Sequence, residues 1–484
     1  MLINELKVII EKFMFNLLGL SKRNIDNCAS QKDLDLLSQQ ENTIFYNECG
    51  LYFHKPFDKN GLKISVNNAY NINYQTEQQV FYSLIKKAEI LLKEDNINET
   101  ERFLIYKNTL ETELIAALLE KEKAKINKVV DLLQKLKLWS SKSYEGKKMP
   151  FAFIIDPLDN SEAKLDYLRF LDSDFSATIT DGVTSIITLD LNCNYLSYNS
   201  IISENNIEKT QIPSNKAIPL RFAQVLCNNI KGKKLGILLL TSGDILLARD
   251  KEILYVLRNG QWINFSSQRY NMMIDSIASK RVLKQNDDDK NQVFSTILDV
   301  SFAHSGGIIA IVKKKEFINS NIISVMDNFL YLFNHNNSYE DYKQSLYKKF
   351  KDEYKSKIVK KGEKYNELTD EQDKKIKNEF EKRFSKRIAI ETLINRNQLE
   401  KVKFVDINRR LRSELVGMDG ATILDEEGYV ISFGAITENE KGSSGGGRGA
   451  AASRLSNYQG YATKISTDGY IELYYDGEIL YQIK

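Results

Sequence analysis

Residues 415–475 read LVGMDGATILDEEGYVISFGAITENEKGSSGGGRGAAASRLSNYQGYATKISTDGYIELYY, and this stretch decides the fold expected for the chain. Two β-rich runs, 421–424 and 429–433, flank a polar turn and predict a hairpin. A glycine-rich loop follows and leads directly into a small-residue helix expected at 450–456. Two more strands are expected at 461–466 and 470–475, around a Thr-Asp-Gly turn. The stretch therefore predicts one compact unit in which a glycine loop and a helix lie between two hairpins.

The glycine loop predicts a site for an anion. Five of the 24 glycines in the chain lie within residues 442–449. Glycines let the backbone approach a ligand closely, and the first turn of a helix carries unpaired N–H groups with partial positive charge. Arg448 adds a planar guanidinium that suits phosphate oxygens. The expected phosphate-binding residues are Gly445, Gly446, Gly447, Arg448 and Gly449. The alternative is a surface linker, although a linker would not run straight into a helix within one compact unit.

Three motifs carry a resemblance to a known family. Residues 418–421, Met-Asp-Gly-Ala, resemble the DGA motif of diadenylate cyclase (DAC) domains of the DisA N-terminal type. Residues 446–452 resemble that family's second motif, Gly-Thr-Arg-His-Arg-Ala-Ala. Residues 302–310 resemble the strand that opens such domains. The resemblance covers residues 285–484, apart from an insertion at about 337–402, and it implies a mixed sheet with flanking helices.

The resemblance also implies a chemistry. In active members each domain holds one ATP, and two domains meet so that each 3′-hydroxyl attacks the other α-phosphate in the presence of Mg²⁺ or Mn²⁺. Asp419 would be a metal ligand or help to activate the hydroxyl, because a carboxylate beside a hard cation stabilises developing charge. Gly420 and Ala421 would leave room for the nucleotide. Arg448 would hold phosphate, and Ser466 in the closing strand would contact the nucleotide.

Departures from the family pattern favour binding over catalysis. The family's Arg-His-Arg is Arg448-Gly449-Ala450 here, and the preceding Thr is Gly447. The acidic residue expected after Ser466 is missing or displaced. Positioned donors often contribute several kcal/mol to transition-state stabilisation, so their loss weakens catalysis more than binding. The sequence thus resembles the DACNV-like sensor branch. An active cyclase that makes c-di-AMP from two ATP and a structural scaffold remain as alternatives, since Asp-Gly is also an ordinary turn signal.

Composition limits the other function classes. A length of 484 residues predicts two or three domains, and a net charge of only +3 argues against DNA binding. The four cysteines form no CxxC motif and are typical of reduced thiols in a cytoplasmic protein, while three scattered histidines predict no His-built metal site. The N-terminal apolar segment carries four charges within it, so it predicts an amphipathic helix rather than a signal peptide or membrane span. That helix would pack on the protein or on a second copy in a homo-oligomer, with contact to a membrane surface as the less favoured role.

Three regions are expected. Residues 1–145 form a helical region, with helices at 78–92 and 99–137 and with Asn98 as an N-cap. Residues 146–284 form a β-rich region that includes a meander at 235–265. Residues 285–484 form the DAC-like domain, with an acidic turn at 287–289, strand-like sequence at 293–312 and a charged helical hairpin at about 337–402. The fold class is therefore α/β in its C-terminal domain and α+β for the whole chain.

Two single residues leave alternatives open. Trp262 is expected to pack in a core, with stacking on a base as the less favoured role. His304 precedes two glycines, so it could approach a ligand or could instead be a packed, hydrogen-bonded side chain.

Overall fold

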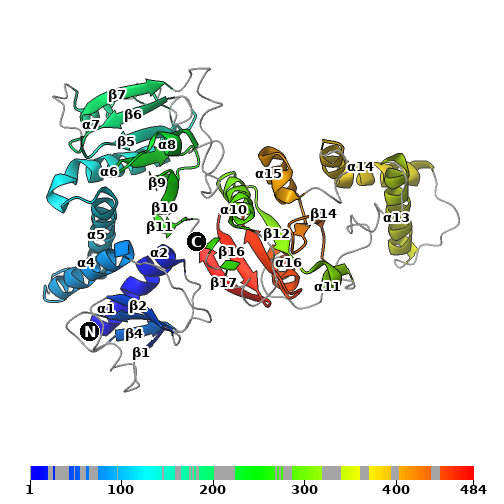
Figure 1. Ribbon diagram of the computed structural model, residues 1–484, viewed down its shortest axis with the longest axis horizontal. Coiled ribbons are helices and arrows are strands. Elements are labelled where there is room, and N and C mark those ends of the chain that lie inside the picture. The colour runs from blue at the N-terminus through cyan, green and yellow to red at the C-terminus, as the bar shows by residue number, and fades with distance from the viewer. Residues whose placement is uncertain are drawn as a thin grey trace. The chain divides into compact units, whose positions relative to one another are not determined.

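The chain divides into two compact units, Met1–Ser276 with Tyr481–Lys484, and Ile277–Leu480. Figure 1 shows the elements of both. The computed structural model describes residues 2–19, 25–27, 43–47, 50–54, 61–64, 75–94, 96–143, 146–158, 165–173, 176, 179–180, 185–200, 224–266, 270–271, 274–275, 286–318, 339–359, 370–393, 403–437 and 447–483. The first unit contains both the helical region and the β-rich region expected from the sequence. Mixed sheets and helices give the chain an α+β fold, as predicted.

The first unit begins with a helix in three segments, α1 (Leu2–Ile9), a π-helical turn (Ile10–Met14) and α2 (Phe15–Leu18). A four-stranded antiparallel sheet follows in the order β1-β4-β3-β2, built from β1 (Ile25–Asn27), β2 (Ile44–Asn47), β3 (Gly50–His54) and β4 (Gly61–Ile64). This sheet lies within the region that was expected to be helical. Its strands have three to five residues, too few for a clear alternating pattern.

Three helices separate the small sheet from the larger one. These are α4 (Gln75–Leu91), α5 (Glu99–Leu119) and α6 (Asn127–Ser141), with a 3₁₀ turn at Lys123–Lys125. Asn98 caps α5 as predicted, and its side chain and that of Glu101 exchange hydrogen bonds with each other's backbone N–H groups. The single helix expected at 99–137 was wrong, because Glu120 adopts a left-handed φ of 52° that ends α5.

The larger sheet of the first unit has the order β11-β10-β9-β8-β5-β6-β7. Its strands are β5 (Phe151–Ile155), β6 (Ser185–Leu189), β7 (Tyr195–Ser200), β8 (Leu235–Leu239), β9 (Ile245–Arg249), β10 (Glu252–Arg258) and β11 (Gln261–Asn264). Strands β8 to β11 form the predicted meander. Two short helices, α7 (Tyr167–Phe170) and α8 (Gln224–Asn229), lie in the connections.

The second unit is built on a six-stranded sheet of order β14-β13-β12-β15-β16-β17. Its strands are β12 (Gly307–Ile311), β13 (Ala421–Leu424), β14 (Val430–Ala435), β15 (Tyr461–Ile465), β16 (Ile471–Tyr475) and β17 (Glu478–Ile483). Its helices include α10 (Asp287–Phe302), α11 (Lys314–Ile318), α15 (Arg409–Val416) and α16 (Gly447–Leu455), with a 3₁₀ turn at Phe404–Asp406. The strand–turn–strand, helix and hairpin expected within 415–475 are all present.

Helix α10 corrects two expectations. Residues 293–302, expected to be strand-like, are helical, and residues 287–289 form the first turn of the helix rather than a solvated acidic turn. The Asn286 side chain accepts a hydrogen bond from the Asp289 backbone N–H at 2.8 Å and so caps the helix. Buried Val293, Ile297 and Val300 recur at helical spacing.

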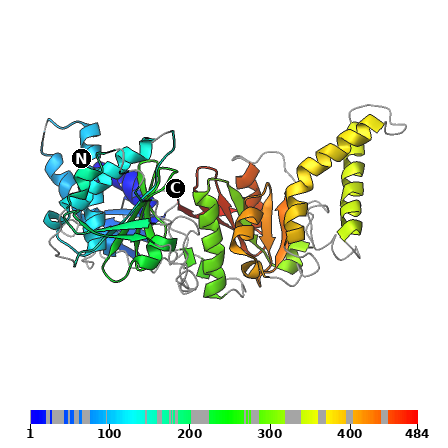
Figure 2. The same cartoon turned by 90° about the horizontal axis from the view of Figure 1, so that it is seen from above.

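The charged insertion folds as two helices, α13 (Tyr339–Val359) and α14 (Asp370–Leu393), which are coloured yellow in Figure 2. Their contact is a small aromatic cluster in which the Phe350 and Phe380 ring centroids lie 5.7 Å apart. Tyr347, Phe350 and Tyr354 of α13 therefore pack within the chain. The sequence Thr-Asp-Glu-Gln at 369–372 is typical of a capping box, and its first position lies outside the described residues.

Six strands of the seven-stranded sheet, in the order β10-β9-β8-β5-β6-β7, match the order β17-β16-β15-β12-β13-β14 in the second unit, and β11 is an extra strand. In each sheet, a central strand pairs in parallel with one neighbour and antiparallel with the other: β5 with β6 and β8, and β12 with β13 and β15. Phe151 lies opposite Leu239 as Gly307 lies opposite Ile465, and the hairpins β8–β9 and β15–β16 match pair for pair. Residues 235–256 and 461–482 share Thr241/Thr467, Gly243/Gly469, Ile245/Ile471, Leu247/Leu473, Asp250/Asp476 and the sequence Glu-Ile-Leu-Tyr at 252–255 and 478–481. The chain therefore contains an internal repeat.

The turn after the parallel neighbour repeats in detail as well. The Asp190 carboxylate accepts hydrogen bonds from the backbone N–H groups of Asn192 and Asn194, each at 2.8 Å. The Asp425 carboxylate accepts them from Glu427 and Tyr429, at 3.0 and 2.9 Å. This match extends the repeat from the β8–β9 hairpin to the β6–β7 connection.

Candidate functional site

The candidate site lies at one edge of the sheet in the second unit. Gly307 begins β12 opposite Ile465, the last residue of β15, and Ile309 pairs in parallel with Thr422. This register brings together the segments that precede β12 and β13 and the turn that follows β15. The residues expected at the site from the DGA motif and the second motif come from these segments and from the start of α16.

Arg448 reaches across this edge from the first turn of α16. Its Nη2 atom lies 3.9 Å from the Asp419 Oδ1 atom, and the Arg448 side chain is 37% exposed while the Asp419 side chain is fully exposed. The guanidinium packs over Gly306, where an added Cβ atom would lie 2.7 Å from Arg448 Nη1 and 3.2 Å from the Thr467 methyl group. Gly306 has a φ of +69°, which also favours glycine. Both charged groups remain accessible to a ligand.

Helix α16 packs close to the sheet because two of its three buried residues are alanines. Ala451, Ala452 and Leu455 pack against β12, β13 and β15 in one core cluster. The glycine loop itself is only partly described, since Gly445 and Gly446 lie outside the described residues. Gly447, Arg448 and Gly449 form the first turn of α16, three residues earlier than the helix start expected from the sequence.

Gly420 and Ala421 have clear packing roles. Gly420 has a φ of +102°, and a Cβ atom there would overlap the backbone of Gly434 in β14. Ala421 is 1% exposed and belongs to the core beneath α16. The motif thus fixes a tight entry into β13 and leaves Asp419 projecting from it.

Ser466 lies in the turn that closes the β15–β16 hairpin. Its backbone N–H donates to the Tyr470 carbonyl oxygen at 2.8 Å, and its carbonyl accepts from the Gly469 N–H at 2.9 Å. Next to it, the Thr467 carbonyl oxygen is 3.1 Å from His304 Nδ1. Of the two roles left open for His304, the hydrogen-bonded one is confirmed, and this contact ties the end of α10 to the turn.

A buried polar group beneath the start of α16 was missed from the sequence. Glu472 accepts hydrogen bonds from Lys464 Nζ at 2.8 Å and from the Tyr474 hydroxyl at 3.0 Å. Burial raises the pKa of Tyr474 and the neighbouring Glu472 raises it further. A Cβ atom on Gly449 would lie 3.5 Å from the Tyr474 hydroxyl and 4.0 Å from Lys464 Nζ. The sequence could have predicted this group, because the Thr-Asp-Gly turn sets a hairpin register in which Lys464 lies opposite Glu472.

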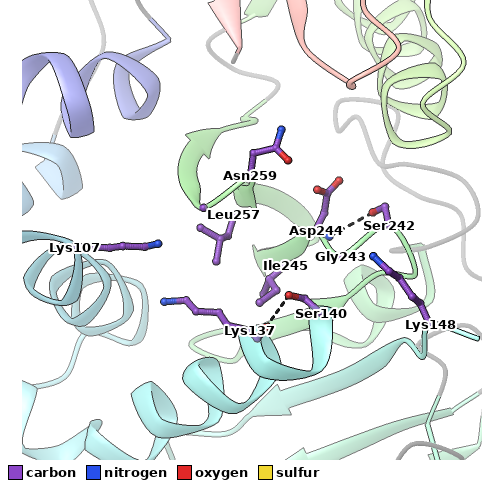
Figure 3. A pocket seen from close by; sticks show the side chains of 11 residues that line it. Lys107, Lys137, Ser140, Lys148, Ser242, Gly243, Asp244, Ile245, Leu257 and Asn259 are labelled. Atoms are coloured by element: carbon purple, nitrogen blue, oxygen red, sulfur yellow. Dashed lines mark hydrogen bonds between the residues drawn. The ribbon is translucent and has the colours of Figure 1, made fainter. Parts of the chain in front are cut away.

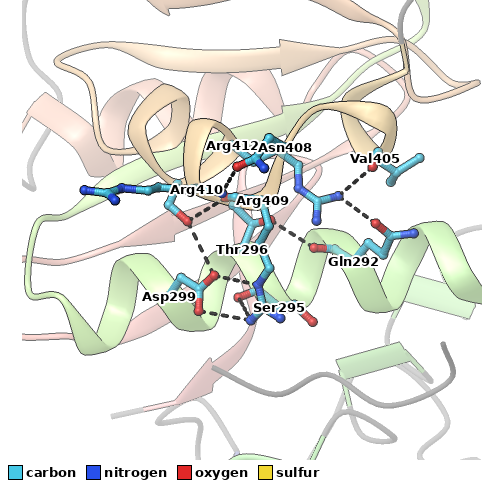
Figure 4. A network of polar contacts seen from close by, with 10 residues as sticks. Gln292, Ser295, Thr296, Asp299, Val405, Asn408, Arg409, Arg410 and Arg412 are labelled. Atoms are coloured by element: carbon cyan, nitrogen blue, oxygen red, sulfur yellow. Dashed lines mark hydrogen bonds and ion pairs between the residues drawn. The ribbon is translucent and has the colours of Figure 1, made fainter. Parts of the chain in front are cut away.

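Two arginines hold α15, the helix that precedes Asp419 in the chain, against α10 (Figure 4). Arg409 donates from Nε and Nη2 to the two carboxylate oxygens of Asp299, at 2.8 and 3.0 Å. Arg412 donates to the Gln292 side chain at 2.8 Å and to the Val405 carbonyl at 3.0 Å. Burial, and next the charge of Arg409, lower the pKa of Arg412 to about 10.

The described residues contain no group of three or more His, Cys, Asp or Glu side chains that could hold a metal ion. Asp419 could supply one carboxylate ligand. This would fit Mg²⁺, which often binds through one or two carboxylates together with substrate phosphates and water.

Comparisons with known proteins did not identify a relative of this chain. No protein-family model, curated protein or solved structure gives a significant match to this chain. Within the part of the chain that the structure describes, no helix is long and apolar enough to cross a membrane.

Proposed function

We propose that the second unit is a DAC-like nucleotide-binding sensor module of a cytoplasmic protein, and that it binds an adenine nucleotide or a cyclic dinucleotide at the start of α16. The observation that carries the proposal is the approach of Arg448 to Asp419 at an exposed helix start. A guanidinium and unpaired helix N–H groups together favour a phosphate group.

Each residue would have a separate role in binding. Arg448 would hold a phosphate, and the first-turn N–H groups of α16 would add to the same attraction. Mg²⁺ or Mn²⁺, if bound with the nucleotide, would neutralise phosphate charge, and Asp419 would provide a protein ligand for it. Gly306 would keep the guanidinium at the sheet edge, because any larger residue would displace it.

A sensor is favoured over a cyclase by the neighbourhood of Gly449. This residue and Ala450 stand where the resembling family has His and Arg. The Nζ atom of Lys464 would lie 4.0 Å from a Cβ atom on Gly449, but Lys464 is already paired with Glu472. Fewer positioned donors would then meet the developing charge of a transition state. Synthesis of c-di-AMP from two ATP remains the second candidate, since Asp419 and Arg448 are both retained.

The test compares nucleotide binding by the full chain and two arginine variants. Isothermal titration with ATP and with c-di-AMP, each with and without Mg²⁺ or Mn²⁺, should detect saturable binding of at least one ligand. Arg448→Ala should weaken it about tenfold or more, as expected for loss of a charge-assisted hydrogen bond. Arg454→Ala, in the last turn of the same helix, is the matched control and should bind normally.

Two results would change the conclusion. Absence of binding by every ligand, or equal losses in both arginine variants, would reject the sensor proposal. Mass spectrometry after incubation with ATP and Mn²⁺ addresses the cyclase. A cyclic dinucleotide that forms with the natural protein and disappears in Asp419→Asn would favour the enzyme.

A further inference from the structure

A basic cavity lies in the first unit, well separated along the chain from the residues of the candidate site. It has a volume of about 320 Å³ and lies between α5, α6 and the turns that connect β8 to β9 and β10 to β11. Figure 3 shows Lys107, Lys137 and Lys148 directed toward it from three segments, together with Ser140 and Ser242. Its volume is near the lower end of the range for small-molecule pockets.

Two of the lysines extend to turns, and in each turn the residue beside the ammonium group is a glycine, which has no side chain. A Cβ atom on Gly260, in the β10–β11 turn, would lie 3.5 Å from Lys107 Nζ. A Cβ atom on Gly243, in the β8–β9 turn, would lie 3.9 Å from Lys148 Nζ. Both glycines have positive φ values, +77° and +93°. The turns therefore keep the space in front of the two ammonium groups open.

The third lysine is anchored at the cavity by a buried carboxylate. Lys137 Nζ pairs with Glu111, which is fully buried and also accepts hydrogen bonds from Gln134 at 2.9 Å and from Trp262 Nε1 at 3.2 Å. Burial lowers the pKa of Lys137, Glu111 opposes this, and the charge of Lys107 lowers it further. Lys107 and Lys137 thus repel each other across the cavity wall.

The cavity retains an excess of positive charge. Asp244 lines it, but its Oδ2 atom accepts from Arg258 Nε at 3.0 Å and from Nη2 at 2.7 Å, so this pair is neutral. Lys137 is balanced by Glu111. No ion pair or hydrogen bond joins Lys107 or Lys148 to any residue that the structure describes. Within the described part of the chain, two ammonium groups therefore face the cavity without a counter-charge.

We propose that this cavity binds a small molecule through a phosphoryl group that carries at least two negative charges. Two ammonium groups that no described residue neutralises match a dianion, and the hydroxyl groups of Ser140 and Ser242 line the same cavity as further hydrogen-bond donors. The site belongs to the first unit and does not rest on the nucleotide site proposed above.

Pyrophosphate is the probe for the test, with inorganic phosphate and chloride as comparisons. Isothermal titration of the full chain should show saturable pyrophosphate binding. Lys107→Met and Lys148→Met should each weaken it about tenfold or more. Lys147→Met is the matched control, because Lys147 neighbours Lys148 in the sequence but does not line the cavity. Arg448→Ala should leave this binding unchanged, which separates it from the nucleotide site.

A second readout separates a binding role from a structural one. Lys107→Met should raise the melting temperature of the ligand-free protein, because it removes the repulsion with Lys137, and it should reduce the rise that pyrophosphate produces. Lack of saturable binding, equal loss in Lys147→Met, or loss only in Arg448→Ala would overturn the proposal.

Discussion

The ion pair between Arg409 and Asp299 allows the most quantitative prediction for the second unit. Its two hydrogen bonds, at 2.8 and 3.0 Å, join α15 to α10, and the side chains are 17% and 10% exposed. Hydrogen bonds to charged groups contribute about 1.5–3 kcal/mol each, and desolvation cancels part of this gain. We expect a coupling free energy of about 2 kcal/mol in a double-mutant cycle of Arg409→Met and Asp299→Asn.

The single substitutions should differ in cost. Asp299→Asn leaves two arginines, Arg409 and Arg412, near each other without the carboxylate, so we expect a loss of about 3–4 kcal/mol in the free energy of unfolding. Arg409→Met removes one of the two like charges. Burial lowers the Arg412 pKa most and the Arg409 charge lowers it further, so this substitution also relieves repulsion, and we expect a loss of about 2 kcal/mol in the free energy of unfolding.

Urea unfolding of the full chain measures these values. Both tryptophans, Trp139 and Trp262, belong to the first unit, so their fluorescence reports on that unit while far-UV circular dichroism reports on both. The coupling free energy of the double-mutant cycle is calculated from the unfolding transition whose midpoint the substitutions shift. A coupling below about 0.5 kcal/mol would refute this reasoning, as would a smaller loss for Asp299→Asn than for Arg409→Met.

Three further predictions follow from single residues. Glu111→Gln should lower the stability of the first unit by about 2–4 kcal/mol, measured by tryptophan fluorescence in urea, because Lys137 loses its counter-charge; adding Lys137→Met should restore part of the loss. Hydrogen bonds from Arg249 and then Lys233 lower the pKa of Glu120 from 4.5 to about 2. The contribution of ionised Glu120 to the stability of the folded state is therefore complete above pH 4.5 and is lost as the pH falls through about 2. Glu120→Gln should remove that part of the acid dependence in melting curves, and an unchanged acid limb would contradict this assignment. Gly307→Ala should destabilise the second unit by several kcal/mol, because its Cβ atom would overlap the Val416 carbonyl oxygen, whereas Gly447→Ala meets no atom within 4 Å and should be neutral or stabilising in the same assay.

Local signals in the sequence predicted the second unit well where turn chemistry was explicit. The Asp425–Gly428 turn and the Thr-Asp-Gly turn at 467–469 placed two hairpins almost to the residue, and Asn98 was recognised as a cap. Position-specific φ requirements and short-range hydrogen bonds decide these features, so the sequence contains the needed information.

Tertiary packing decided what the sequence did not predict. The apolar run at 293–302 fits a strand or a helix, and the Asn286 cap and the buried face of α10 select the helix. The polar group around Glu472 and the arginines at 409 and 412 need partners from distant segments. The approach of Arg448 to Asp419 likewise depends on Gly306, which lies in the strand-opening segment 302–310, far along the chain from both residues.

The internal repeat has a consequence for how this chain assembles. The hairpins β8–β9 and β15–β16 have matching registers, and each is followed by the sequence Glu-Ile-Leu-Tyr. During synthesis, each hairpin therefore resembles a pairing partner for either central strand. Similar neighbouring modules are prone to exchange of strands and misassembly. The central strands differ sharply, since Phe151 and Phe153 occupy the places of Gly307 and Ile309. Because the side chains of the two central strands differ in size, each hairpin packs well against only one of them. This difference would disfavour exchange of hairpins between the two sheets.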